Sequence, residues 1–162
     1  MIELHPNANV SALADIEDST RGTRIIVGER TVVDSFVKIK PAGGSGDLII
    51  GADTVINSGC VLYTGNGITI GDHVAIAANC TFAPVNHQYR RRDKLIRQQG
   101  FCHSKGGIII EDDVWIGANC VILDGVVLRK GCVIGAGSLV RGEIAAYSIN
   151  AGQPLKIIGW RT

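Results

Sequence analysis

The sequence has few aromatic residues, few prolines and no long hydrophobic run. Only 5% of the 162 residues are aromatic, and four are proline. No segment approaches the roughly 20 consecutive apolar residues that a membrane-spanning helix needs, so we expect no membrane insertion. The first ten residues, MIELHPNANV, lack a basic segment followed by an apolar run, and we therefore expect no signal peptide.

The chain also has almost no net charge. Sixteen lysines and arginines balance 15 aspartates and glutamates, which leaves a formal charge of +1. A near-neutral chain gives no electrostatic argument for binding nucleic acid. The five cysteines are an odd number with no predicted export signal, and we interpret them as reduced thiols of a cytoplasmic protein.

What the sequence does have is a large apolar residue at every sixth position, in six sets of three. The 18 positions are Leu4, Val10, Ile16, Val27, Val33, Ile39, Ile50, Ile56, Leu62, Ile70, Ile76, Phe82, Ile110, Ile116, Ile122, Leu128, Ile134 and Val140. Four positions after most of them stands a small or β-branched residue. The 21 glycines suit the sharp corners that such a repeat requires.

A period of six differs from the 3.6 of a helix and the two of a simple strand. It predicts a triangular coil with one short strand on each side, in which successive turns stack as parallel strands about 4.8 Å apart. We therefore predict an all-β parallel β-helix of about six coils that forms a single domain over residues 1–162. Short inserts are expected at 22–26, 45–49 and 68–69, a long loop at 88–109, and a short C-terminal capping segment at 154–158.

Four segments, in order, resemble the hexapeptide-repeat acyltransferases. They are residues 85–87, 110–119, 133–140 and 149–158. The resemblance covers roughly residues 50–158 and is strongest to the maltose, galactoside and surface-polysaccharide O-acetyltransferases. It implies a left-handed β-helix, a homotrimer, and transfer of an acetyl group from acetyl-CoA to a hydroxyl of a sugar or polysaccharide precursor.

The histidine at the start of the long loop is the catalytic base in that family, and here it is His87. The repeat agrees, because it places Asn86 on the inward column and His87 just outside it, where the chain leaves the coil. Imidazole exchanges a proton at cellular pH, which suits removal of a hydroxyl proton.

The resemblance also implies a cofactor groove along the later coils. Backbone groups near Ala118 and Ala136 match positions that hold the pantetheine arm. Lys156 matches a basic residue near the phosphates of CoA, and Arg141 and Arg161 are further candidates there.

One residue is expected to meet the acceptor, and it has two interpretations. Asn57 matches a position that contacts the acceptor sugar in galactoside-type enzymes, but an asparagine at a coil corner can equally stabilise that corner. The family's acidic residue before the fourth coil is absent, since Gly65 and Asn66 stand there. The identity of the acceptor therefore stays open.

Several other residues have two interpretations. The basic cluster at 90–94 is either a solvated loop or a contact for an anionic acceptor. Cys60, Cys80 and Cys120 share one column and are expected to form an interior ladder, whereas Cys102 lies in the long loop. Trp115 is expected to point outward.

Three alternative functions remain open. The first is N-acetylation of an amino sugar or antibiotic, and the second is a non-catalytic β-helix used for assembly. The third is a γ-class carbonic anhydrase, which needs three histidines on zinc; the four histidines here do not match that pattern, so we expect no metal site.

Overall fold

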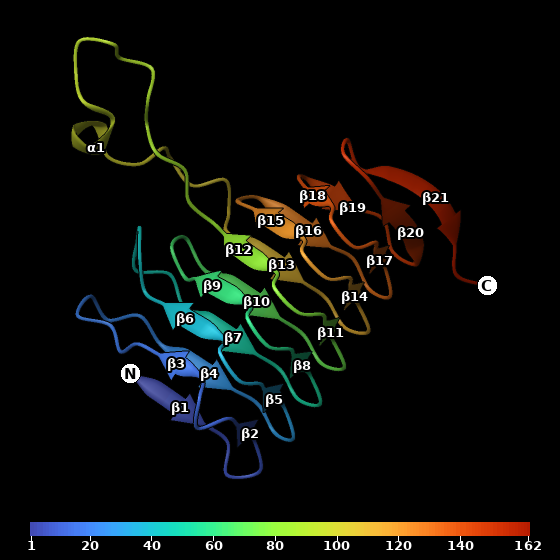
Figure 1. Cartoon of the computed structure of the whole chain (residues 1–162). Coiled ribbons are helices and arrows are strands. Elements are labelled where there is room, and N and C mark those ends of the chain that lie inside the picture. The colour runs from blue at the N-terminus through green and yellow to red at the C-terminus, as the bar shows by residue number, and fades with distance from the viewer.

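The computed structural model of the chain is a triangular column of stacked coils whose three sides are sheets (Figure 1). Sheet A contains β1 (Ile2–Leu4), β4 (Ile25–Val27), β7 (Leu48–Ile50), β10 (Ile68–Ile70), β13 (Ile108–Ile110), β16 (Val126–Leu128) and β19 (Glu143–Ile144). Sheet B contains β2 (Asn9–Val10), β5 (Val32–Val33), β8 (Val55–Ile56), β11 (Ala75–Ile76), β14 (Trp115–Ile116), β17 (Val133–Ile134), β20 (Ser148–Ala151) and β21 (Lys156–Trp160). Sheet C contains β3 (Asp15–Ile16), β6 (Lys38–Lys40), β9 (Val61–Tyr63), β12 (Thr81–Ala83), β15 (Val121–Leu123) and β18 (Leu139–Val140).

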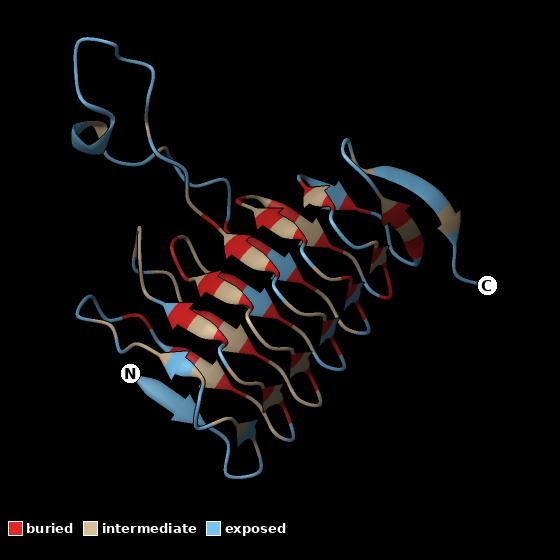
Figure 2. Cartoon of the chain, in the orientation of Figure 1, coloured by how far each residue is buried: buried red, intermediate tan, exposed pale blue.

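Equivalent residues of successive coils lie directly above one another. In sheet B, for example, Ile76 pairs in parallel with Ile56 on one side and with Ile116 on the other. All 15 predicted inward residues of coils 2 to 6 are at most 1% exposed, and buried residues line the inside of the column (Figure 2). The predicted left-handed parallel β-helix is confirmed.

The first coil is less well covered, because it has a neighbour on one side only. Leu4 is 44% exposed, and Val10 and Ile16 are half-buried. At the other end the repeat continues beyond residue 145 into a partial seventh coil, formed by β19 and β20. The chain then turns back, and β21 pairs antiparallel with β20, so the capping segment begins and ends two residues later than predicted.

The predicted inserts were partly wrong. Residues 25–26, 48–49 and 68–69 belong to strands β4, β7 and β10. These strands are three residues long, and their first residues (Ile25, Leu48 and Ile68) also point into the core. The same holds at β13, so the long excursion runs over residues 84–107 instead of 88–109. Asn86 is exposed and does not lie on the inward column, because the chain has already left the coil.

The three corners of the triangle differ in how much their length varies from coil to coil. The A-to-B and B-to-C corners have four residues in each of the six complete coils, whereas the C-to-A corner ranges from two residues to the 24 of the excursion. In most four-residue corners the third residue has a positive φ, as at Asp53, Asn79 and Asn119. A turn with a residue at positive φ has a defined backbone conformation that tolerates no insertion. Variation in length is therefore concentrated at the C-to-A corner.

The excursion projects from the side of the column and contains the only helix, α1 (Ile96–Gln99) (Figure 1). No helix in the structure has the length and apolar character needed to cross a membrane.

Replacing Ile76 with alanine should lower the free energy of unfolding by about 2–5 kcal/mol, because Ile76 is fully buried between two neighbouring coils. Leu4→Ala is the matched control and should cost clearly less, since Leu4 is nearly half exposed. Denaturant unfolding measures both. Equal losses for the two variants would contradict a core whose stability depends on stacking from both sides.

Candidate active site

His87 lies at the root of the excursion, on a short antiparallel stem. The Gln88 amide donates to the Gly100 carbonyl (2.9 Å), and the Cys102 amide donates to the Asn86 carbonyl (2.8 Å). His87 itself is bridged to Phe101, and their rings pack with centroids 4.8 Å apart at 39°. The imidazole is exposed, and neither ring nitrogen has a hydrogen-bond partner in the chain. The stem therefore presents a ring of restricted orientation whose nitrogens are both available.

Asp124 fixes the returning limb of the excursion, and sequence reasoning missed it. It lies in the tight turn between β15 and β16 and is almost fully buried. Its carboxylate accepts hydrogen bonds from the backbone amides of Lys105 (2.8 Å) and Gly107 (3.0 Å) and from the side chain of Asn66 (3.4 Å). A buried carboxylate needs such donors, because without them its burial is costly. Its partners lie 17, 19 and 58 positions away in the chain, so no local sequence pattern could have revealed these contacts.

Asn57 lies at a B-to-C corner, where its side chain supports the coil. The amide Nδ2 donates to the Ile76 carbonyl of the next coil at 2.7 Å. This bond agrees with the corner interpretation. The side-chain oxygen has no partner in the chain, so a contact between Asn57 and an acceptor stays a prediction.

Ala118 and Ala136 lie at the B-to-C corners of the fifth and sixth coils, one above the other. The Gly137 amide donates to the Ala118 carbonyl (2.8 Å), whereas the amides of Ala118 and Ala136 donate to no group of the chain. A Cβ at Gly117 would come within 2.5 Å of the Ala136 nitrogen, so the corner requires small residues. The corner thus offers two free N–H donors, one above the other, on a surface that has no bulky side chains.

A surface cavity of about 440 Å³ lies beside this column. It is lined by Leu139, Arg141, Gln153, Pro154 and Leu155. Gln153 closes one side by donating from Nε2 to the Gly137 carbonyl at 3.1 Å.

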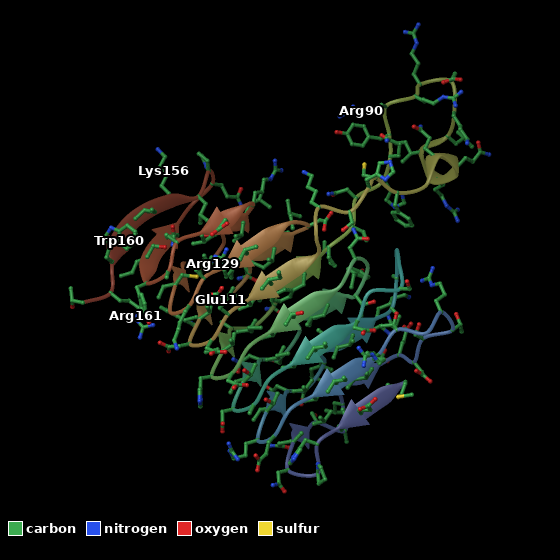
Figure 3. All side chains as sticks on the ribbon, turned by 180° about the vertical axis from the view of Figure 1, so that it is seen from behind. Arg90, Glu111, Arg129, Lys156, Trp160 and Arg161 are labelled. Atoms are coloured by element: carbon green, nitrogen blue, oxygen red, sulfur yellow. The ribbon has the colours of Figure 1, made fainter.

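Of the three basic residues predicted to lie near the phosphates of CoA, two are in no ion pair and one is held by an aspartate. Lys156 follows Leu155 at the start of β21, and it and Arg141 are exposed and in no ion pair. Arg161 instead bonds the Asp113 carboxylate (2.8 Å) and the Gly131 carbonyl (3.0 Å), which orients its guanidinium toward the coil (Figure 3). Two cations are therefore available beside the cavity.

The cysteines, which are the remaining candidates, lie mostly in the core. Cys60, Cys80 and Cys120 are fully buried in one column, and each thiol lies 3.2 Å from a carbonyl of the next coil. Burial raises the pKa of Cys132 to about 11, which disfavours its thiolate. Cys102 is half-buried, with its sulfur 3.4 Å from the His87 carbonyl.

Trp115 is 53% exposed, so its predicted outward orientation is confirmed. No group of three histidine, cysteine or acidic side chains is arranged to hold a metal ion.

Family models match two parts of the chain. Residues 107–142 match a model described as bacterial transferase hexapeptide (six repeats), and residues 47–81 match one described as hexapeptide repeat of succinyl-transferase. The two matches cover coils and leave out all of the excursion except its last residue, Gly107.

The curated proteins that are similar in sequence include two acetyltransferases. Galactoside O-acetyltransferase of Escherichia coli is 34% identical over 113 residues, which is 67% of this chain and 52% of that protein. A protein of Mycobacterium tuberculosis, named as a probable acetyltransferase, is 28% identical over 158 residues, which is 98% of this chain and 49% of that protein. The chain thus spans about half the length of these relatives.

A solved structure resembles nearly the whole chain. It is a mutant of AntD, an N-acyltransferase from Bacillus cereus, in complex with dTDP-4-amino-4,6-dideoxyglucose and coenzyme A. The TM-score is 0.83 with 26% sequence identity, and the match covers 99% of this chain and 84% of the other.

Replacing Asp124 with alanine should loosen the stem of the excursion. The change removes two hydrogen bonds to backbone amides, each worth about 1–3 kcal/mol when the remaining partner stays unsatisfied. Hydrogen–deuterium exchange of residues 86–88 and 100–107 should then speed up by about tenfold or more. Asp112→Ala is the control, because Asp112 also accepts a backbone amide, that of Asp72, at a coil corner. If amide exchange in the stem is no faster in Asp124→Ala than in Asp112→Ala, the role of Asp124 is refuted.

Proposed function

Because the chain belongs to the hexapeptide-repeat transferase family, we propose that it is an acetyl-CoA-dependent O-acetyltransferase acting on a hydroxyl of a sugar or polysaccharide precursor. The observation that carries this proposal is the placement of His87. Its ring is held against Phe101 at the root of the excursion, is open to solvent, and keeps both nitrogens free.

His87 acts as the general base in the proposed reaction. A ring nitrogen removes the hydroxyl proton of the acceptor while the hydroxyl oxygen forms a bond to the thioester carbonyl carbon. Backbone N–H groups stabilise the negative charge that develops on the carbonyl oxygen. When the intermediate collapses, the carbon–sulfur bond breaks and the imidazolium returns its proton to the departing thiolate. The products are an acetyl ester and CoA with a free thiol.

Acetyl-CoA fits the groups present at the B-to-C corner. The free amides of Ala118 and Ala136 can bond the amide groups of a pantetheine arm, and their small side chains allow close approach. Arg141 lines the cavity beside this column, and Lys156 directly follows Leu155 of the same lining. Both are exposed and in no ion pair, which suits the phosphates of CoA. Arg161, held by Asp113, is left out of this assignment.

The candidate residues lie at two different corners, and this favours a homotrimer. Ala118, Ala136 and Asn57 follow the B-to-C corner, whereas His87 lies at the C-to-A corner. A base at one corner reaches a cofactor bound at another if a neighbouring subunit brings the two corners together. We therefore propose that each active site forms between two subunits of a closed threefold assembly.

The five free thiols agree with a cytoplasmic location, which we include in the proposal.

N-acetylation of an amino sugar is the second candidate. It is favoured by the likeness to AntD, an N-acyltransferase whose complex contains an amino sugar linked to dTDP. The same site serves both reactions, since an amine also loses a proton when it attacks the thioester. Hydroxyl and amino forms of one sugar, assayed side by side, distinguish them.

Titration with acetyl-CoA tests the cofactor assignment without any acceptor. Calorimetry should show about one saturable site per subunit, and Lys156→Ala should weaken binding by about tenfold, because the lysine is exposed, in no ion pair and adjacent in sequence to the cavity lining. His87→Ala is the control and should bind normally. Absence of binding at millimolar acetyl-CoA would refute the proposed function.

His87→Ala should lower kcat for acetyl transfer by about 10²–10⁴-fold, the usual contribution of a general base, with little change in KM for acetyl-CoA. A coupled thiol assay with a panel of sugars measures it. Turnover of the variant equal to that of the wild type would exclude His87 as the base.

Mixed oligomers test the shared site. Subunits carrying His87→Ala are dissociated and reassembled with subunits carrying Lys156→Ala. The assay uses acetyl-CoA well below the Kd of the Lys156→Ala variant, where that parent has little activity. Recovery of activity above that of either parent is then expected where base and cofactor groove come from different subunits. Activity that stays at the level of the parents would place the complete site within one subunit.

A further inference from the structure

The charge of the chain is divided unevenly between the excursion and the coils. Residues 84–107 contain six of the 16 lysines and arginines but only one of the 15 acidic residues, so the excursion carries a net charge of +5. The remaining residues therefore carry a net charge of −4. The near-neutral total therefore combines a basic excursion with acidic coils. Such separation of charge favours the binding of anionic ligands at the excursion.

Most of these cations have no internal partner. Arg91 bonds Asp93 at 2.6 Å, which is the only ion pair within the excursion. Arg90, Arg92, Lys94 and Arg97 are all exposed and unpaired, and Arg90 extends away from the ribbon (Figure 3). These charges repel one another, so an anion that binds among them relieves the repulsion.

The cations surround a hollow that also has an apolar part. An open surface cavity of about 530 Å³ lies here, and it is lined by Tyr89, Arg91, Arg92, Lys94, Leu95, Ile96 and Arg97. Tyr89 is 65% exposed, so the face of its ring is available for stacking. Guanidinium groups bind phosphate through paired hydrogen bonds, and an exposed aromatic ring stacks on a planar base. The lining therefore matches a ligand with phosphate groups and a flat apolar part.

The cavity begins close to the proposed base. Tyr89 and Arg90 follow His87 by two and three residues, a separation of at most about 10 Å along an extended chain. A ligand whose phosphates lie among the arginines can therefore extend a sugar ring toward the imidazole.

We propose that residues 89–97 bind the diphosphate and base of a nucleoside-diphosphate-linked sugar, which makes the acceptor anionic. This inference rests on the proposed function, whose acceptor class it specifies. The phosphates of CoA do not explain the cluster, because their proposed cations lie elsewhere. Lys156 is at the start of β21, at the end of the column away from the excursion (Figure 3), and Arg141 lines a cavity with Leu155. Arg92, Lys94 and Arg97, which line the cavity, act as specificity determinants, and His87 remains the base.

Binding of nucleotides tests the proposal without turnover. UDP, GDP and inorganic pyrophosphate are titrated by calorimetry into the wild-type protein with CoA present at saturation, and uridine and guanosine are the uncharged comparisons. We expect at least one nucleoside diphosphate to bind at least tenfold more tightly than its nucleoside. Raising the salt from about 0.05 M to about 0.5 M should weaken that binding, because exposed charges are screened. No measurable diphosphate binding would overturn the proposal.

A double variant, Arg92→Ala with Lys94→Ala, should weaken diphosphate binding by about tenfold or more. Lys130→Ala is the matched control, because Lys130 is an exposed cation at an A-to-B corner, and it should bind as the wild type does. Both changes lie outside the strands, so equal unfolding midpoints exclude a folding defect. Diphosphate binding that the double variant leaves unchanged would place the ligand elsewhere.

Two further measurements on the double variant separate the other possible occupants. Weakened acetyl-CoA binding would assign the cluster to CoA, and a changed sedimentation coefficient would assign it to a second copy of the chain. Either result overturns the proposal. Failure of the proposed function is distinct, since it requires loss of acetyl-CoA binding by the wild-type protein itself.

Discussion

The structure depends on the stacking of each coil on the next through parallel backbone hydrogen bonds. Strands of two or three residues are too short to be stable alone, and a single coil leaves its inner face open to water. In the stack, Ile76 lies between Ile56 and Ile116, and each buries the others. The exposure of Leu4 at the open end shows what a coil loses without a second neighbour.

Stacking also dictates where the chain can vary. Two corners repeat the same four-residue turn and place residues such as Asp53 and Asn119 at positive φ, so an insertion there would displace every strand above it. The C-to-A corner lacks this constraint, because its segments leave the column and return without altering the register. The excursion that contains His87 occupies this tolerant corner, and its ends are secured by Asp124 and by the stem to Phe101.

The repeat was predictable because period six is visible in the chemistry of single residues, and it located the core almost completely. The ends of the strands were not, since Ile25 and Ile68 differ from insert residues only by pointing inward. Asn86 was placed on the inward column by continuing the period past the point where the chain leaves the coil. The role of Asp124 depends on a contact between distant segments, which no local pattern encodes.

The proposed division of the site between two corners explains why fold and function would be specified by different parts of this sequence. The B-to-C corner repeats small residues and free amides, as at Ala118 and Ala136, and these belong to the same geometry that builds the coil. The proposed groove for a common acyl donor therefore follows from the repeat itself. The excursion follows no repeat, so its composition can change without cost to the stack, and its excess positive charge reflects a requirement other than folding. Recognition of the acceptor is the requirement that its position beside His87 best explains.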